Sequence, residues 1–122
     1  MKCCLVVDDS RVVRMVARRV LQELAFDVRE AANGEEALVA CRRQMPEAVL
    51  LDWNMPVMNG IDFLRALRRM PGGGAPVVVF CTTESDLKHI QQAIDLGANE
   101  YIMKPFDSEI IELKFAQVGL LG

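Results

Sequence analysis

Polar side chains that could take part in chemistry follow four separate apolar runs of this sequence. They are Asp8, Asp9, Asp52, Thr82 and Lys104. Uninterrupted apolar runs are typical of strands that are buried on both faces of a parallel sheet. The carboxyl ends of such strands meet at one edge of the sheet, where ligands bind. We therefore expect these three carboxylates, one hydroxyl and one amine to lie close together.

Carboxylates gathered at one edge repel each other, and one of them would take up a proton unless a cation balanced their charge. Lys104 supplies one positive charge. The remaining negative charge suits a divalent cation, and a ligand set made of oxygen atoms favours Mg²⁺ over a transition metal. Asp8 and Asp9 are adjacent, so in an extended segment their side chains point to opposite sides. One of them could contact the metal directly and the other through water.

With Mg²⁺ and a lysine beside it, Asp52 is a candidate nucleophile for phosphoryl transfer. Attack of its carboxylate on phosphorus would form an aspartyl phosphate. The metal and Lys104 would stabilise charge on the phosphoryl oxygens, and Thr82 could hydrogen-bond to them. Each residue taken singly has an ordinary explanation as a turn residue, a helix cap or part of a solvated loop. Their joint occurrence at four strand ends favours the site.

The elements that must position these residues alternate between strands and helices. Apolar runs predict strands at residues 3–7, 48–51, 77–81 and 101–103, and a weaker one around Val28. A helical pattern follows each strand, and the side chains expected on the buried helix faces include Val16, Cys41, Leu87, Ile94 and Leu113. Asn33 and Glu36 have the spacing of a capping box. Five strand–helix pairs predict a doubly wound α/β fold, a parallel sheet with helices on both faces.

Composition and charge exclude several other classes of protein. A chain of 122 residues with 52% hydrophobic residues fits a single domain with one core. Its net charge of -3 and the lack of a basic tract argue against a nucleic-acid partner. No stretch reaches the ~18 apolar residues of a membrane span, and the N-terminus does not resemble a signal peptide. The four cysteines have no CxxC spacing, which predicts reduced structural thiols in a cytoplasmic protein. The Gly-rich loop at Gly72 lacks the Lys-Ser/Thr of a P-loop.

Four motifs make the sequence resemble the receiver domain of two-component response regulators. They are LVVDDS around Asp8, LLDWNMPVMNG around Asp52, CTTE around Thr82 and EYIMKPF around Lys104. The resemblance extends from Leu5 to about Val118 and implies the flavodoxin-like receiver fold. The chain is most similar to the stand-alone, single-domain chemotaxis regulators, so residues 1–122 are expected to form one receiver domain without an output domain.

The resemblance also implies roles for individual residues. Asp52 would be the phospho-acceptor. Asp8, Asp9 and Asp52 would bind Mg²⁺ together with the backbone carbonyl of Asn54. Thr82 and Lys104 would contact the phosphoryl group, and a cis peptide bond would join Lys104 to Pro105.

A second set of residues would transmit the signal in a protein of this family. Movement of Thr82 toward the phosphate would let the aromatic switch residue, Tyr101, turn inward. The expected partner face consists of Ser85, Leu87, Lys88, Tyr101, Met103 and Phe106. A sensor histidine kinase would supply the phosphate. A flagellar motor switch protein is the leading candidate for the partner, and control of a kinase or a phosphate-sink role comes next. The protein is expected to be monomeric and to catalyse only its own phosphorylation and dephosphorylation.

The alternative is a Mg²⁺-dependent phosphohydrolase that uses Asp52 to turn over small phosphate esters. Such enzymes usually need a second Asp two residues after the nucleophile and a cap that excludes water. Asn54 occupies that position, and no insertion is long enough to form a cap. Among the remaining residues, Glu84 either lies at the start of a helix, where acidic residues are common, or influences dephosphorylation. His89 is expected at the surface. No role is assigned to Trp53.

Overall fold

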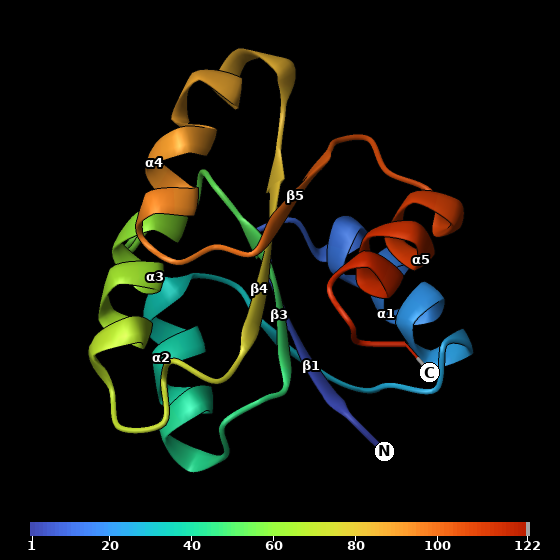
Figure 1. Ribbon diagram of the computed structural model, residues 1–122, viewed down its shortest axis with the longest axis horizontal. Coiled ribbons are helices and arrows are strands. Elements are labelled where there is room, and N and C mark those ends of the chain that lie inside the picture. Colours follow the sequence, from blue (N-terminus) through green and yellow to red (C-terminus); the bar gives the residue numbers. More distant parts are fainter. Residues whose placement is uncertain (122) are drawn as a thin grey trace.

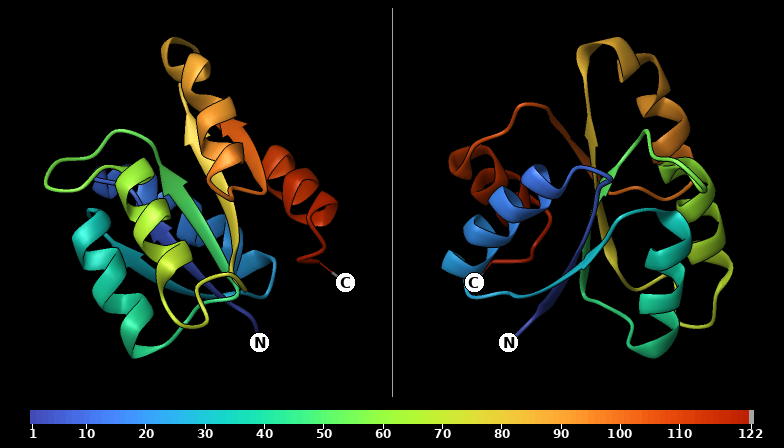
Figure 2. Two further views of the ribbon diagram at one scale, coloured as in Figure 1. Left: turned by 60° about the vertical axis from the view of Figure 1, so that its left-hand side comes forward. Right: turned by 180° about the vertical axis from the view of Figure 1, so that it is seen from behind.

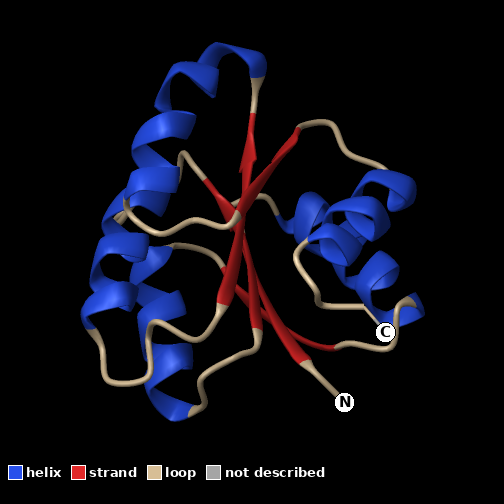
Figure 3. Ribbon diagram, viewed as in Figure 1, coloured by secondary structure: helices blue, strands red, loops and turns tan. Residues whose placement is uncertain are grey.

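A five-stranded parallel sheet forms the centre of the molecule in the computed structural model, which describes residues 1–121 except the side chains of Glu84, Ser85 and Leu87 (Figures 1 and 3). The strands are β1 (Cys3–Val7), β2 (Asp27–Ala31), β3 (Ala48–Asp52), β4 (Val77–Thr82) and β5 (Glu100–Met103). Their order in the sheet is β2-β1-β3-β4-β5. The predicted doubly wound α/β fold is confirmed.

The helices cover both faces of this sheet. They are α1 (Arg11–Glu23), α2 (Gly34–Arg43), α3 (Gly60–Arg69), α4 (Ile90–Asp95) and α5 (Ser108–Gln117), with a 3₁₀-helix, η1 (Glu84–His89), before α4. Helices α1 and α5 lie on one face, and α2, α3 and α4 lie on the other (Figures 1 and 2). Within the described part of the chain, no helix has the length and apolar character needed to cross a membrane.

Four helices begin at a side chain that accepts a hydrogen bond from the backbone N–H three residues later. These cap residues are Ser10, Asn33, Asn59 and Asp107. Each satisfies one of the N–H groups that a helix leaves unpaired in its first turn. The predicted capping pair is present, since the Asn33 oxygen lies 2.9 Å from the Glu36 nitrogen and the Glu36 carboxylate accepts from the N–H of Ala32.

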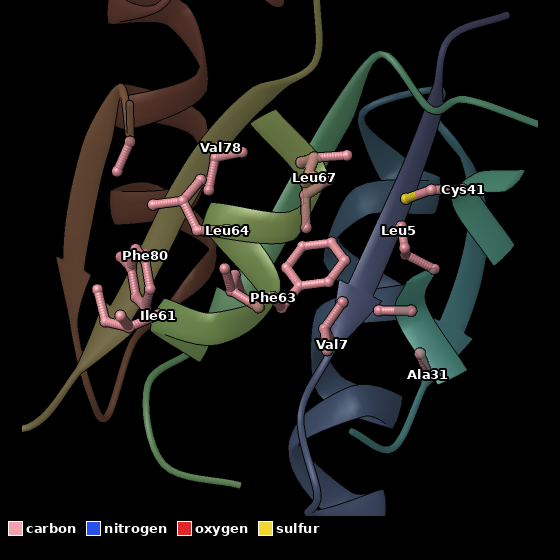
Figure 4. Close-up of a cluster of buried hydrophobic side chains, with 14 of the residues drawn as sticks. Leu5, Val7, Ala31, Cys41, Ile61, Phe63, Leu64, Leu67, Val78 and Phe80 are labelled. Carbon is pink, nitrogen blue, oxygen red and sulfur yellow. The ribbon is translucent and has the colours of Figure 1, made fainter. Parts of the chain in front are cut away.

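Alternate residues of the central strands point into two separate cores. Leu5 and Val7 of β1 face the side of α2 and α3, whereas Cys4 and Val6 face the side of α1 and α5. Figure 4 shows the first core, in which Phe63 and neighbouring side chains of α3 pack on the sheet. Because both of their faces are buried, the three central strands β1, β3 and β4 contain almost only apolar residues until their carboxyl ends. All four cysteines are buried free thiols, as predicted.

Three helix positions differ from the sequence-based expectation. Val16, Ile94 and Leu113 were expected to face inward, but they are 43%, 40% and 52% exposed. Ala93 is the buried residue of α4. The 3₁₀ segment before α4 has about three residues per turn instead of 3.6, which rotates the following helix relative to a continuous α-helical pattern. Leu87, which was assigned to the same inward face, lies outside the described side chains.

Candidate functional site

The ends of β1 and β3 meet at the point where the chain changes direction across the sheet. β1 pairs with β2 on one side and with β3 on the other, so the connections that leave β1 and β3 lead to opposite faces and open a crevice between them. Val7 and Leu51 are partners in the register. Asp8 and Asp52 each follow one of these partners, and the fold therefore brings them to the same crevice.

Three carboxylates gather at this crevice. Asp8, Asp9 and Asp52 each offer an oxygen atom, and these oxygens all lie within 4.8 Å of one another. Asp8 is 3% exposed and Asp52 is 7% exposed, while Asp9 is exposed. The burial of two acidic side chains is costly unless a cation or hydrogen bonds compensate for the lost hydration.

Lys104 provides part of that compensation. It follows β5 directly, and its Nζ lies 2.8 Å from Oδ2 of Asp8 and 2.9 Å from Oδ1 of Asp52. Burial alone would lower the pKa of Lys104, but the hydrogen bonds with Asp8 and Asp52 outweigh it, and the pKa is raised. Lys104 is therefore a firmly charged ammonium group shared by two strand ends.

The positive charge of Lys104 does not balance the three carboxylates. Burial raises the pKa of Asp52 to about 6, with the Lys104 hydrogen bond acting against this and the charge of Asp8 adding to it. A further cation beside Asp52 would stabilise the ionised form of its carboxyl group, which burial disfavours. Carboxylate oxygens at this spacing fit a hard divalent ion such as Mg²⁺. The residues present are thus suited to the expected metal.

The polar groups of Asp8 are held from several directions. Its N–H donates to the carbonyl of Ala31 at 3.1 Å, and its Oδ1 accepts from the N–H of Ser10 at 2.9 Å. Its carbonyl accepts from Nη1 of Arg14 at 2.7 Å. Arg14 in turn donates from Nε to Glu30 at 3.0 Å. This role could not be predicted from the sequence, because Arg14 is one of several arginines on α1 and its partner Glu30 lies on β2.

Thr82 and Tyr101 lie where the sequence predicted them, at the end of β4 and in β5. Thr82 is 1% exposed, and its hydroxyl donates to the carbonyl of Thr83 at 3.2 Å. Tyr101 is half-buried beside the core under α3, and Nζ of Lys114 lies 5.1 Å from the centre of its ring. Asn54 is exposed in the loop after β3. The predicted cis peptide bond between Lys104 and Pro105 is present.

The loop after β3 contains two constrained positions. Gly60 donates to the carbonyl of Trp53 at 2.9 Å, and a Cβ atom on Gly60 would come within 2.3 Å of the Asp52 carbonyl. A larger residue at position 60 would therefore displace the end of β3. Val57 has a φ of 69°, a left-handed conformation that a β-branched residue rarely adopts.

Trp53 and His89 stack on each other, with ring centres 4.5 Å apart and an angle of 12° between the planes. His89 was expected at the surface and is instead half-buried against the indole. Sequence reasoning missed the contact because it joins two residues from distant segments. Glu84, Ser85 and Leu87, which were assigned to dephosphorylation or the partner face, lie outside the described side chains.

Known proteins resemble this chain over most of its length. It is 35% identical over 116 residues to the chemotaxis protein CheY1 of Helicobacter pylori, which covers 93% of this chain and 94% of that protein. It is 40% identical over 102 residues to the DNA-binding response regulator MtrA of Mycolicibacterium paratuberculosis, which covers 84% of this chain and 44% of that protein. The structure of the Vibrio cholerae chemotaxis protein CheY4 matches with a TM-score of 0.91 and 31% identity, over 97% of this chain and 98% of that chain. Residues 4–115 match the family described as the response regulator receiver domain. The chain therefore belongs to the response regulator receiver domain family of two-component signalling.

Proposed function

We propose that this receiver domain is a signalling switch that accepts a phosphoryl group on Asp52. The observation that carries the proposal is the position of the Asp52 carboxylate, which is buried at the switch point of the sheet, contacts Lys104 and lies beside Asp8 and Asp9. A buried carboxylate beside a fixed ammonium group and two further acids is the arrangement that phosphoryl transfer to an aspartate requires.

The transfer step uses Asp52 as the nucleophile. With a pKa of about 6, Asp52 is largely ionised at neutral pH. One carboxylate oxygen attacks the phosphorus of a phosphohistidine, and a P–O bond forms as the P–N bond breaks. The electron pair of the broken bond stays on the imidazole, which takes up a proton from solvent. Lys104 is close enough to Asp52 to stabilise charge on the phosphoryl oxygens, and this is the main requirement for catalysis of this step.

The acidic cluster would hold Mg²⁺ through Asp8, Asp9, Asp52 and the backbone carbonyl of Asn54. When bound, the metal would neutralise negative charge on the phosphoryl group and on the carboxylates around it. Asp8 is oriented for this task by Ser10, Ala31 and Arg14 before any ligand arrives.

The switch that follows phosphorylation would begin at Thr82. A hydroxyl group has one hydrogen, and that of Thr82 is donated to the carbonyl of Thr83. To bind a phosphoryl oxygen, Thr82 must leave this hydrogen bond and turn toward Asp52. Tyr101 would respond to the change, and the partner face would include Lys88, Met103 and Phe106 as well as Ser85 and Leu87.

The phosphoryl donor would be a sensor histidine kinase in the cytoplasm, and the output would be the binding of a downstream protein by the monomeric domain. Two of the similar proteins, from H. pylori and V. cholerae, carry chemotaxis in their names. This similarity supports a role in chemotaxis, with a flagellar motor switch protein as the partner. Control of a kinase or a phosphate-sink function is the second candidate.

Incubation with acetyl phosphate and Mg²⁺ tests the proposal. We expect one acyl phosphate per chain, lost in Asp52→Asn and sensitive to hydroxylamine, as acyl phosphates are. Asp62→Asn is a matched control, because Asp62 is an exposed acid in the first turn of α3. The domain would catalyse only its own phosphorylation and dephosphorylation. Sustained turnover of a generic phosphate ester would instead support the phosphohydrolase alternative.

A further inference from the structure

The stacked pair of Trp53 and His89 joins two segments that the proposed switch must move relative to each other. Trp53 directly follows the acceptor Asp52, and His89 ends η1 in the connection that begins after Thr82. Their rings are nearly parallel, at 12°, with centres 4.5 Å apart. The Phe80 ring also contacts the indole, with its centre 5.6 Å from that of Trp53 and an angle of 50° between the planes.

Trp53 is the fixed member of the pair. Its N–H donates to the carbonyl of Cys81 at 3.2 Å, and its carbonyl accepts from the N–H of Gly60 at 2.9 Å. These two hydrogen bonds hold its backbone to β4 and to the start of α3. The indole packs against the core cluster that contains the buried residues of α3 and Ala93 of α4. Helices α2, α3 and α4 cover this face of the sheet (Figure 1).

His89 belongs to the segment that the proposed switch would move, the connection from Thr82 through η1. Thr82 is at the end of β4, and its hydroxyl donates a hydrogen bond to the carbonyl of Thr83, the first residue of the connection to η1. The carbonyl of Thr83 also accepts from the N–H of Asp86 in η1 at 3.0 Å. The Thr83 carbonyl thus links the resting position of the Thr82 hydroxyl to the first turn of η1, and His89 ends that helix.

We propose that His89 is a positioning residue for phosphoryl acceptance, which holds Thr82 in its resting position by stacking η1 on Trp53. This inference rests on the proposed function of Asp52. The stack stabilises the arrangement in which Thr82 donates to Thr83, and it therefore opposes the movement of Thr82 toward a phosphoryl group. A contact between two aromatic rings shifts such an equilibrium by roughly two- to tenfold, and the apparent affinity for a phosphoryl ligand falls by the same factor.

The test measures the affinity of Asp52 for beryllofluoride, a phosphoryl mimic, at saturating Mg²⁺ and fixed pH by ¹⁹F NMR of the bound species. We expect His89→Ala to bind beryllofluoride about two- to tenfold more tightly than the wild type. His89→Phe retains an aromatic ring and should restore the wild-type affinity. Gln92→Ala serves as the matched control, because Gln92 is an exposed residue in the first turn of α4.

A second variant, His89→Gln, removes the ring while keeping a polar side chain, and thermal unfolding of all variants shows that each is folded. Affinity for beryllofluoride that is unchanged or weaker in both His89→Ala and His89→Gln would overturn the inference. So would a failure of His89→Phe to restore the wild-type value. A wild-type protein that binds no beryllofluoride at Asp52 would instead overturn the proposed function, and the inference would fall with it.

The only tryptophan of the chain, Trp53, gives an independent readout. If the stack opens when Thr82 moves, beryllofluoride with Mg²⁺ should change the Trp53 emission of the wild type. In His89→Ala the emission should differ from the wild type before the mimic is added, and the further change should be smaller. Equal changes in the two proteins would contradict the proposed movement.

Discussion

The ammonium group of Lys104 lies 2.8 Å from Oδ2 of Asp8 and 2.9 Å from Oδ1 of Asp52, and so joins the ends of three strands. β1 and β3 are neighbours in the sheet, but β4 separates β3 from β5. The long side chain of Lys104 thus spans β4 and connects the end of β5 to the ends of β1 and β3, which share no backbone hydrogen bonds with β5. The first prediction follows from this bridge.

Removal of the Lys104 charge should destabilise the metal-free protein. Lys104→Met leaves two buried carboxylates without their cation, and the free energy of unfolding should fall by about 1–3 kcal/mol. Mg²⁺ should restore more stability to Lys104→Met than it adds to the wild type, because the metal replaces the missing positive charge. Urea denaturation with and without Mg²⁺ measures both effects. Lys88→Met, at an exposed lysine, is the control and should change neither quantity.

The stability of the metal-free protein should depend on the protonation of Asp52. Its folded-state pKa of about 6 lies above the ordinary value of about 3.9. Protonation of Asp52 therefore stabilises the folded protein relative to the unfolded chain. This stabilisation is complete below about pH 4 and is lost as the pH rises through about 6. Asp52→Asn removes this titration, and between these pH values it should gain up to about 3 kcal/mol relative to the wild type.

Denaturation in the presence of a chelator, at several pH values from 4 to 7.5, measures this difference. Asp62→Asn should follow the wild-type profile, because Asp62 is exposed on α3. Profiles for the wild type and Asp52→Asn that run parallel across this range would show that the buried carboxylate carries no such penalty.

The hydrogen bond from Arg14 to the carbonyl of Asp8 should control Mg²⁺ affinity. Arg14 holds this carbonyl at 2.7 Å while Glu30 holds Arg14, so that the segment with Asp8 and Asp9 is oriented before the metal binds. Loss of a group that orients a metal ligand typically weakens binding by about tenfold or more. Arg14→Met should therefore weaken Mg²⁺ binding by about tenfold, measured through the Trp53 emission.

Two further variants separate geometry from charge at this position. Arg14→Lys keeps the positive charge but lacks the planar group that donates to two acceptors at once, so it should restore only part of the affinity. Arg19→Met removes a charge from an exposed position of the same helix and should bind Mg²⁺ as the wild type does. Equal weakening in Arg14→Met and Arg19→Met would indicate that only the net charge of α1 matters.

The backbone strain at Val57 should limit stability. Val57 is 76% exposed and has a φ of 69°, in a region that Asn tolerates much better than a β-branched residue does. Val57→Asn should raise the free energy of unfolding by about 1 kcal/mol, because it relieves this strain without loss of a buried contact. Val12→Asn, at an exposed valine in α1, should be neutral or slightly destabilising. A loss of stability in Val57→Asn would show that the valine side chain makes a favourable contact in this loop.

The fold could be predicted from the sequence because strands buried on both faces need continuous apolar residues. The runs at residues 3–7, 48–51 and 77–81 therefore marked the strands, although β3 and β4 each extend one residue further, to Asp52 and Thr82. Helix faces were less predictable. Ile94 fits an α-helical pattern in the sequence, but the 3₁₀ turn before it changes the direction in which it points.

The sequence by itself determined the set of residues at the carboxyl edge, because each of them directly follows a strand in a sheet whose parallel arrangement was already implied. Only the tertiary structure decided which of them touch. The shared contact of Lys104 with Asp8 and Asp52, the support of Asp8 by Arg14, and the stacking of His89 on Trp53 all join residues from different elements. These contacts depend on strand order, on the rotation of each helix and on side-chain conformation. Those properties arise from packing the whole chain, and no local pattern of residues encodes them.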